Sequence, residues 1–195
     1  MQNTAKPVLV LASRSPRRRQ LLDQIGLGYS VQAVDVAEVP EPGERPLAYV
    51  TRVARAKAEA GLQAAGRAGL PVLAADTAVV VDGCILGKPA GRAQAMAMLG
   101  RLSGRSHRVY TAVALLHGEI ETAVSVSKVT LRRIDAGERA AYWATGEPAD
   151  KAGGFGIQGR GAVFVERGVG SYSGVMGLPL FETGAMLAAI GVQLP

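Results

Sequence analysis

Hydroxyl and arginine side chains gather in a short segment near the start of the chain and could bind an anion. Residues 13–19 read Ser-Arg-Ser-Pro-Arg-Arg-Arg and directly follow the apolar run at 7–11, which predicts a buried strand. Ser15 suits a helix N-cap and Pro16 suits the first helical position, so a helix N-terminus is expected there. Backbone N–H groups, the helix dipole and bidentate arginines all favour phosphate oxygens. The segment is therefore either a phosphate site or a solvated basic helix start.

Two carboxylates could supply chemistry at a bound phosphate. Asp76 follows the apolar run at 71–75, where a carboxylate is costly unless water, a cation or a polar partner meets it. Ligand clefts also form at the carboxyl ends of strands in α/β sheets. Asp76 could be a general base toward water, a ligand for Mg²⁺, or only the cap of a turn. Glu38 is the natural second carboxylate, although its loop also carries Glu41 and Glu44, which could equally be surface acids.

Lysine is scarce, and three of the five lysines lie beside candidate segments. Lys57 lies on an expected long helix, Lys88 follows an expected hairpin, and Lys151 opens the glycine-rich stretch 151–161. Each could contact phosphate oxygens or remain a solvated surface charge. Gln158, within the glycine-rich stretch, could hydrogen-bond to a base edge or simply hold its loop in place. Their positions favour a phosphate site without deciding it.

The pattern of apolar residues predicts an α/β fold with a mixed sheet. Strands alternate with helices in the first half and follow one another later, in a single domain over residues 1–195. The glycine-rich stretch near 153–161 is expected to line a cleft between two lobes. Strands are expected at 7–11, 29–36, 71–75, 78–81, 84–86, 108–116, 122–131 and 162–166, and helices beginning near 16, 46, 92, 135 and 177.

Composition and missing motifs narrow the class of protein. The net charge of +6 comes mainly from arginine and suits nucleic acid, an anionic membrane or a phosphorylated small molecule as partner. Cys84 is the single cysteine, and no apolar stretch approaches the roughly 20 residues of a membrane span. The chain has no secretory signal, phosphate-loop motif or Gly-x-Ser-x-Gly motif, and His107 and His117 lack metal-ligand spacing. These features predict a cytoplasmic enzyme with no membrane partner.

A series of short segments, spread in order over nearly the whole chain, forms one pattern. The segments are 12–18, Glu38, Tyr49-Val50 with Arg52 and Lys57, 75–77, 87–89, 102–104, 110–114, 150–153, 156–159 and 177–180. Taken together, they resemble the Maf family of nucleoside triphosphate pyrophosphatases. The resemblance implies an elongated Maf/ITPase-like fold. It also implies hydrolysis of a nucleoside triphosphate between the α and β phosphates, with Mg²⁺ or Mn²⁺, to a monophosphate and pyrophosphate.

The resemblance also implies roles for individual residues. Asp76 matches the family's proposed proton acceptor, and Glu38 matches an acidic site position that would hold the metal together with Asp76. The positions that surround the triphosphate in the family are matched by Ser13, Arg17, Arg18, Lys57 and Lys88. A homodimer is expected on the same ground.

Three positions divide the family by substrate. Arg17, Thr77 and Gln158 fit the branch that acts on dTTP and UTP, as housecleaning of nucleotide pools. The branch acting on 7-methyl-GTP typically carries tryptophan at the first position and glutamine at the second. The amide of Gln158 could also satisfy the carbonyl and N–H of a pyrimidine.

Two alternatives and one departure stay open at this point. A basic nucleic-acid-binding module without turnover would explain the charge, but Asp76 and Glu38 would repel a nucleic-acid backbone unless a cation intervenes. Among enzymes, the alternative is a pyrophosphatase of broader specificity, or one for 7-methyl-GTP. The family often has Asp-Glu where this chain has Ala37-Glu38, which predicts weaker metal binding unless Asp35 substitutes.

Overall fold

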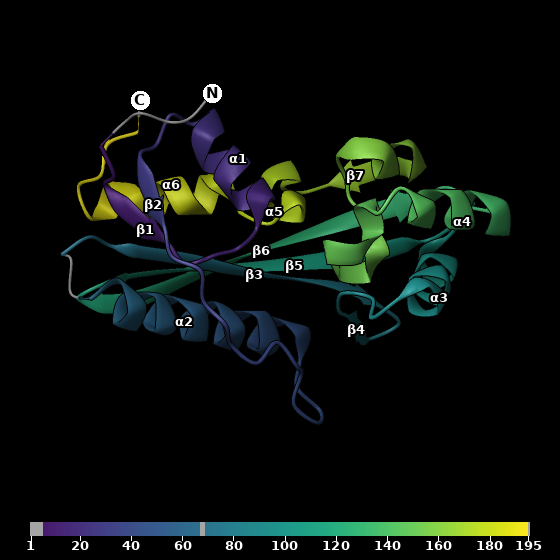
Figure 1. The fold of residues 1–195 in the computed structure, drawn as a ribbon, viewed down its shortest axis with the longest axis horizontal. Helices are drawn as coiled ribbons and strands as arrows, with labels where there is room; N and C mark the ends of the chain where they lie inside the picture. The colour runs from purple at the N-terminus through teal and green to yellow at the C-terminus, as the bar shows by residue number, and fades with distance from the viewer. Residues whose placement is uncertain (1–5, 67–68, 195) are drawn as a thin grey trace. The chain divides into compact units, whose positions relative to one another are not determined.

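The strands of the computed structural model, which describes residues 6–66 and 69–194, form a seven-stranded sheet (Figure 1). The order is β2-β1-β3-β5-β6-β7, and β4 pairs with β3 outside this path. β1 is parallel to β2 and β3, whereas β4 is antiparallel to β3 and β7 is antiparallel to β6. The predicted α/β fold with a mixed sheet is confirmed. The strands are β1 (Leu9–Leu11), β2 (Tyr29–Val31), β3 (Val72–Val81), β4 (Cys84–Leu86), β5 (Ser106–His117), β6 (Glu119–Leu131) and β7 (Val165–Val169).

The helices begin largely where the sequence predicts. Pro16 and Pro46 open the first two, and a capping box of Asp135 and Glu138 opens α4. The short helix α5 is not predicted. Within the described residues, every helix is too short or too polar to cross a membrane. The helices are α1 (Pro16–Gln24), α2 (Pro46–Ala65), α3 (Arg92–Leu102), α4 (Ala136–Ala144), α5 (Tyr172–Met176) and α6 (Leu180–Ala189), with 3₁₀ segments η1 (Glu147–Asp150), η2 (Ala152–Gly154) and η3 (Gly159–Phe164).

The chain divides into two compact units. In the first unit, α1 and α2 lie on opposite sides of β1 (Figure 1). A single domain over residues 1–195, and a cleft lined by the glycine-rich stretch, stay predictions. The first unit consists of Met1–Asp76, Thr111–Ser125 and Gly177–Pro195, and the second of Thr77–Tyr110 and Val126–Met176.

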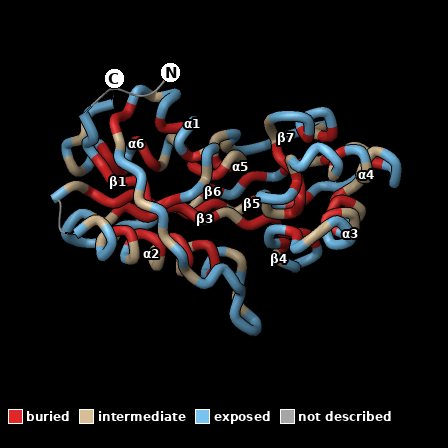
Figure 2. The backbone as a smooth tube through the Cα atoms, in the orientation of Figure 1, coloured by how far each residue is buried: buried red, intermediate tan, exposed pale blue. Residues whose placement is uncertain are grey.

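A single glycine sets how closely α2 approaches the strands of the first unit. A Cβ at Gly61 would lie 2.6 Å from the Cβ of Ala12 and 2.9 Å from Cγ1 of Val72. Only a residue without a side chain permits this contact. This close packing buries the apolar stripe of α2. The loop before α2 is mostly exposed, whereas strands β1 and β3 are buried (Figure 2).

The second unit has its own hydrophobic core. Phe164 packs edge-on against Tyr142 with ring centroids 5.2 Å apart. The core is formed by residues of the strands, of α3 and α4 and of the segment before β7. Phe155 and Phe164 belong to it, so the glycine-rich stretch is anchored to this core. Its buried members are Val79, Val81, Leu86, Met98, Leu99, Leu102, Val109, Val129, Leu131, Ile134, Tyr142, Phe155 and Phe164.

Several element boundaries differ from the prediction, among them the start of α6 at Leu180 rather than near 177 and the start of β6 at Glu119 rather than at 122. β3 does not end before Asp76 but continues through it to Val81, so this carboxylate lies in mid-strand. Lysine and arginine side chains near Asp76 offset the cost of a buried carboxylate, and valines continue the strand pattern beyond it. β2 stops at Val31 rather than at residue 36, and residues 159–164 form η3, so the last strand begins at Val165 instead of 162.

His107 in the second unit makes folding stability depend on pH. It is 3% exposed, its ring lies edge-on to Phe155, and neither ring nitrogen has a hydrogen-bond partner among the described residues. Burial lowers its pKa from 6.5 to about 4. Between these two pKa values the histidine is protonated in the unfolded chain and neutral in the folded chain. The free energy of unfolding is therefore highest above pH 6.5 and decreases as the pH falls toward 4.

We expect His107→Phe to remove this acid sensitivity while keeping the ring contact with Phe155. The wild type should lose about 3 kcal/mol of unfolding free energy between pH 6.5 and 4 through this residue, and the variant should not. Urea unfolding at several pH values measures the difference. The exposed His117, changed to Gln, is the control. An equal loss in His107→Phe and in the wild type would contradict the assignment.

Candidate active site

The arginine-rich segment of the first unit folds around the hydroxyl of Ser13. The Oγ of Ser13 accepts hydrogen bonds from the backbone N–H of Ser15 (3.1 Å) and from Nη1 of Arg18 (3.2 Å). Ser15 is the N-cap of α1, but its side chain makes no capping hydrogen bond within the described residues. Both acceptor positions of the Ser13 hydroxyl are thus used, and its proton is the part left to donate to a phosphate oxygen.

Arg18 is buried and joins two distant parts of the first unit. Its Nε donates to the carbonyl of Gly177 at 2.7 Å, so the first turn of α1 is tied to the turn before α6. Burial lowers the pKa of Arg18, and the negative charge of Asp76 opposes the effect. Arg18 therefore shapes the loop and adds positive charge toward Asp76, while Arg17 beside it is half-buried.

A buried lysine joins the two predicted carboxylates. The Nζ of Lys57 lies 2.7 Å from Oε1 of Glu38 and 2.8 Å from Oδ1 of Asp76. The side chains of Lys57 and Asp76 are 8% and 6% exposed, whereas that of Glu38 is 37% exposed. The helical spacing of α2 places Lys57 on the same buried stripe as Val50 and Val53, which directs the ammonium toward β3.

One oxygen of Asp76 remains without a partner. Its Oδ2 is buried and accepts no hydrogen bond from the described residues, while Oδ1 is held by Lys57. Burial raises the pKa of Asp76, and the charges of Lys57 and Arg18 oppose that rise. A buried acceptor that is ionised and unsatisfied favours a water molecule or a cation beside it. This oxygen is therefore a candidate for the group that acts on the substrate.

The loop that carries Glu38 is held against α2 by Tyr49 and Arg52, for which the sequence predicts no individual role. The hydroxyl of Tyr49 donates to the carbonyl of Glu38 at 3.0 Å. Arg52 binds both carboxylate oxygens of Glu44 at 2.7 Å and donates to the carbonyl of Val39 at 3.2 Å. Arg52 therefore holds the acidic loop against α2. Tyr49 and Arg52 lie three positions apart on α2, and this spacing is the sequence feature that places them on one side of the helix.

We expect Tyr49→Phe to lower kcat/KM about fivefold, because a hydrogen bond worth about 1 kcal/mol no longer holds Glu38 in place. Initial rates with the preferred substrate measure this. Tyr29→Phe is the control, since it removes an exposed hydroxyl that bonds Asp23. Unchanged kcat/KM in Tyr49→Phe would show that Glu38 does not depend on this contact.

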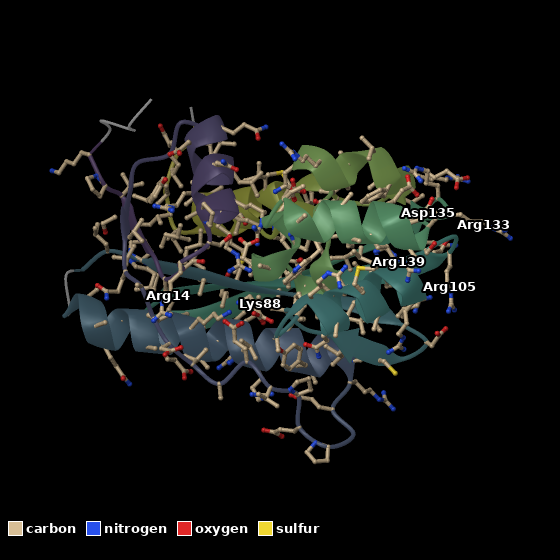
Figure 3. All side chains as sticks on the ribbon, turned by 45° about the vertical axis from the view of Figure 1, so that its right-hand side comes forward. Arg14, Lys88, Arg105, Arg133, Asp135 and Arg139 are labelled. Carbon is tan, nitrogen blue, oxygen red and sulfur yellow. The ribbon has the colours of Figure 1, made fainter. Side chains whose placement is uncertain are left out.

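The remaining predicted residues lie in the second unit. Thr77 is half-buried and follows Asp76 directly along β3, and Lys88 is exposed after β4 (Figure 3). Gln158 is half-buried and immediately precedes η3. Lys151 binds Asp150 and the carbonyl of Glu147, which makes it part of the second unit's own structure. That these side chains meet those of the first unit around one substrate stays a prediction.

The donor set of the first unit fits a divalent cation that keeps most of its water. Glu38 and Asp76 are two carboxylates on one lysine, and Oδ2 of Asp76 is an unsatisfied acceptor. Mg²⁺ is commonly held by one or two carboxylates together with substrate phosphates. The described residues contain no group of three or more His, Cys, Asp and Glu side chains that could hold a metal. Glu38 and Asp76 are thus the residues of the first unit that could contribute to a cation site shared with substrate phosphates.

Comparison with known proteins identifies the family. The Maf-like protein family model matches residues 8–190. The chain belongs to the Maf family. Two similar curated proteins support this. The dTTP/UTP pyrophosphatase of Alkalilimnicola ehrlichii is 52% identical to this chain over 191 residues, which cover 96% of this chain and 95% of that protein. The dTTP/UTP pyrophosphatase of Methylococcus capsulatus is 54% identical over 185 residues, with 94% and 91% covered.

A solved structure is also similar over most of the chain. The nucleoside-triphosphatase / dITP/XTP pyrophosphatase of Mycobacterium abscessus is 22% identical, covers 93% of each chain and has a TM-score of 0.44. A similarity of this degree says nothing about residue roles. The family expected from the sequence segments is confirmed by the family model and the curated relatives.

Proposed function

We propose that this Maf-family chain hydrolyses dTTP and UTP between the α and β phosphates, giving a nucleoside monophosphate and pyrophosphate. The observation that carries the proposal is the buried Asp76, held on one oxygen by Lys57 and unsatisfied on the other. The names of relatives about half identical to this chain support the substrate. The activity would remove unwanted triphosphates from nucleotide pools in the cytoplasm, and a homodimer stays a prediction.

The residues of the first unit divide the chemistry among them. Lys57 fixes Asp76 so that Oδ2 can accept a proton from water, and the burial that raises the pKa of Asp76 makes it a stronger base. Water is then added across the α–β anhydride, and pyrophosphate leaves. Ser13 donates its hydroxyl proton and Arg17 its guanidinium hydrogens to phosphate oxygens, and Arg18 holds Ser13 in place.

Glu38 and Asp76 are the residues that would hold Mg²⁺ or Mn²⁺, and Oδ2 of Asp76 would serve either as a ligand of that cation or as the proton acceptor for water. When bound, such a cation neutralises phosphate charge and stabilises the negative charge of the departing pyrophosphate. Lys88 of the second unit would add a further positive charge. Ala37 leaves this site one carboxylate short of the usual family pattern, which favours a weakly held cation.

Three residues would select the base and sugar of the substrate. Arg17, Thr77 and Gln158 carry the side chains of the dTTP- and UTP-specific branch. The amide of Gln158 can donate to a pyrimidine carbonyl and accept from its N–H. This pairing would distinguish dTTP and UTP from CTP, whose base presents an amino group instead.

The test is a substrate panel with the purified chain and Mn²⁺. dTTP, UTP, CTP, GTP and 7-methyl-GTP are incubated separately, and the products are resolved by chromatography. Monophosphate and pyrophosphate from dTTP and UTP support the proposal. Preference for 7-methyl-GTP would overturn the specificity assignment, and nucleic-acid binding without turnover of any triphosphate would overturn the activity.

A further inference from the structure

In the second unit, one hydrogen-bonded pair of side chains binds both ends of the segment 156–161, which contains Gln158. The hydroxyl of Tyr142 accepts from the backbone N–H of Gly156 at 3.2 Å and donates to Oε1 of Glu147 at 2.7 Å. Oε1 of Glu147 also accepts from the N–H of Gly161 at 3.0 Å. One tyrosine–glutamate pair therefore holds the first and the last residue of the segment.

The second oxygen of the glutamate completes this attachment. Oε2 of Glu147 accepts from the N–H of Arg160 at 2.8 Å, so two successive N–H groups bind one carboxylate. Glu147 is itself fixed by Thr145, whose Oγ1 accepts from its N–H, and by Lys151, which donates to its carbonyl. Burial acts to raise the pKa of Glu147, but the hydrogen bonds from Tyr142, Gly161 and Arg160 and the charge of Lys151 lower it overall, which favours the ionised carboxylate.

Two glycines show how tightly the segment is drawn onto this pair. A Cβ at Gly161 would lie 2.5 Å from the hydroxyl of Tyr142, and one at Gly159 would lie 2.8 Å from Oε2 of Glu147. Gly159 also has a positive φ of 74°, which a residue with a side chain rarely adopts. The contacts that fix the segment are thus made by its backbone. The hydrogen bonds from Tyr142 and Glu147 do not involve the side chain of Gln158.

We infer that Tyr142 and Glu147 are positioning residues that set substrate selectivity by fixing the backbone on which Gln158 is presented. The inference rests on the proposed function, because it assigns the base contact to Gln158. Tyr142 is 4% exposed and lies in the core of the second unit. Its bonds to Gly156 and Glu147 therefore attach the segment to side chains that are packed in place. A base contact depends on the direction of its donor and acceptor. Loosening the segment therefore reduces discrimination between bases more than it reduces turnover.

The experiment measures selectivity, as the ratio of kcat/KM for dTTP to kcat/KM for CTP, in the purified full-length chain with Mn²⁺. We expect this ratio to fall about fivefold in Tyr142→Phe, which loses the hydroxyl's bonds to Gly156 and Glu147, and about tenfold in Glu147→Gln, which loses the negative charge that three donors bind. The kcat for dTTP should change less than the ratio. Tyr172→Phe and Glu166→Gln are matched controls, because both residues are exposed and neither takes part in the hydrogen bonds from Tyr142 and Glu147 that hold the segment.

A double-mutant cycle separates this inference from the proposed function. In the Gln158→Ala background, Tyr142→Phe should lower the selectivity ratio no further, because the contact it positions is already gone. If Gln158→Ala lowers the ratio but Tyr142→Phe and Glu147→Gln lower kcat/KM for dTTP and CTP equally, the pair is only structural and the inference is wrong. If wild type does not hydrolyse dTTP, or Gln158→Ala leaves the ratio unchanged, the proposed function fails instead. If Glu147→Gln does not fold, the conservative Tyr142→Phe decides alone.

Discussion

Asp76→Asn should lower kcat about a thousandfold while the protein stays folded, because an amide cannot accept the proton of the attacking water. The substitution keeps the size of the side chain, and its carbonyl oxygen can still accept from Lys57 at the position of Oδ1. Burial raises the pKa of Asp76, which means that its ionised form lowers the stability of the folded chain at neutral pH. The asparagine variant should therefore unfold at no lower a denaturant concentration than wild type. Product formation from dTTP and urea unfolding measure the two effects.

The same carboxylate should control the acidic side of the pH profile. Because Asp76 must be ionised to accept a proton, kcat/KM should fall as pH drops through its pKa, and that midpoint should lie above the usual range of aspartate near 4. Asp23 changed to Asn is the control, since this exposed side chain bonds only Tyr29 in the described residues. Residual activity near the wild-type level in Asp76→Asn would reject Asp76 as the proton acceptor.

Lys57→Met should cause the largest loss of stability of any single change in the site. It leaves Glu38 and Asp76 without the ammonium that lies within 2.8 Å of both, and removing one partner of a buried pair costs about 3 kcal/mol or more. Turnover should also fall at least a hundredfold, because Asp76 loses the contact that orients it. Thermal unfolding and initial rates measure both effects, and Lys57→Arg should retain part of the stability because it keeps the charge.

A divalent cation should compensate for the missing ammonium in this variant. Two carboxylates without a lysine between them attract Mn²⁺ or Mg²⁺ more strongly, so millimolar Mn²⁺ should raise the melting temperature of Lys57→Met more than that of wild type. The exposed Lys128, changed to Met, is the control and should respond like wild type. Equal stabilisation of Lys57→Met and wild type by Mn²⁺ would show that Glu38 and Asp76 do not form a cation site.

Local signals in the sequence determined most of the elements. Proline and the cap residues set where α1, α2 and α4 begin, and apolar runs set β1 and the first half of β3, because these features act within a few residues of the chain. The residue types of the site could also be selected from the sequence. A carboxylate after an apolar run and a dense arginine segment are costly or unusual unless they bind something, which made Asp76 and residues 13–19 candidates.

Tertiary structure alone decided how these residues act on one another. The sequence places Lys57 nineteen positions from both Glu38 and Asp76, and only the packing of α2 against β3 brings its ammonium between the two carboxylates. The role of Arg18 as a phosphate ligand stays a prediction, and its bonds to the carbonyl of Gly177 and the hydroxyl of Ser13 are contacts that only the fold could show. Tyr142 and Glu147 carry no local signal, because their role depends on hydrogen bonds to the backbone of a distant segment. Backbone N–H groups are the same at every residue type, so a sequence cannot show which of them a side chain will bind.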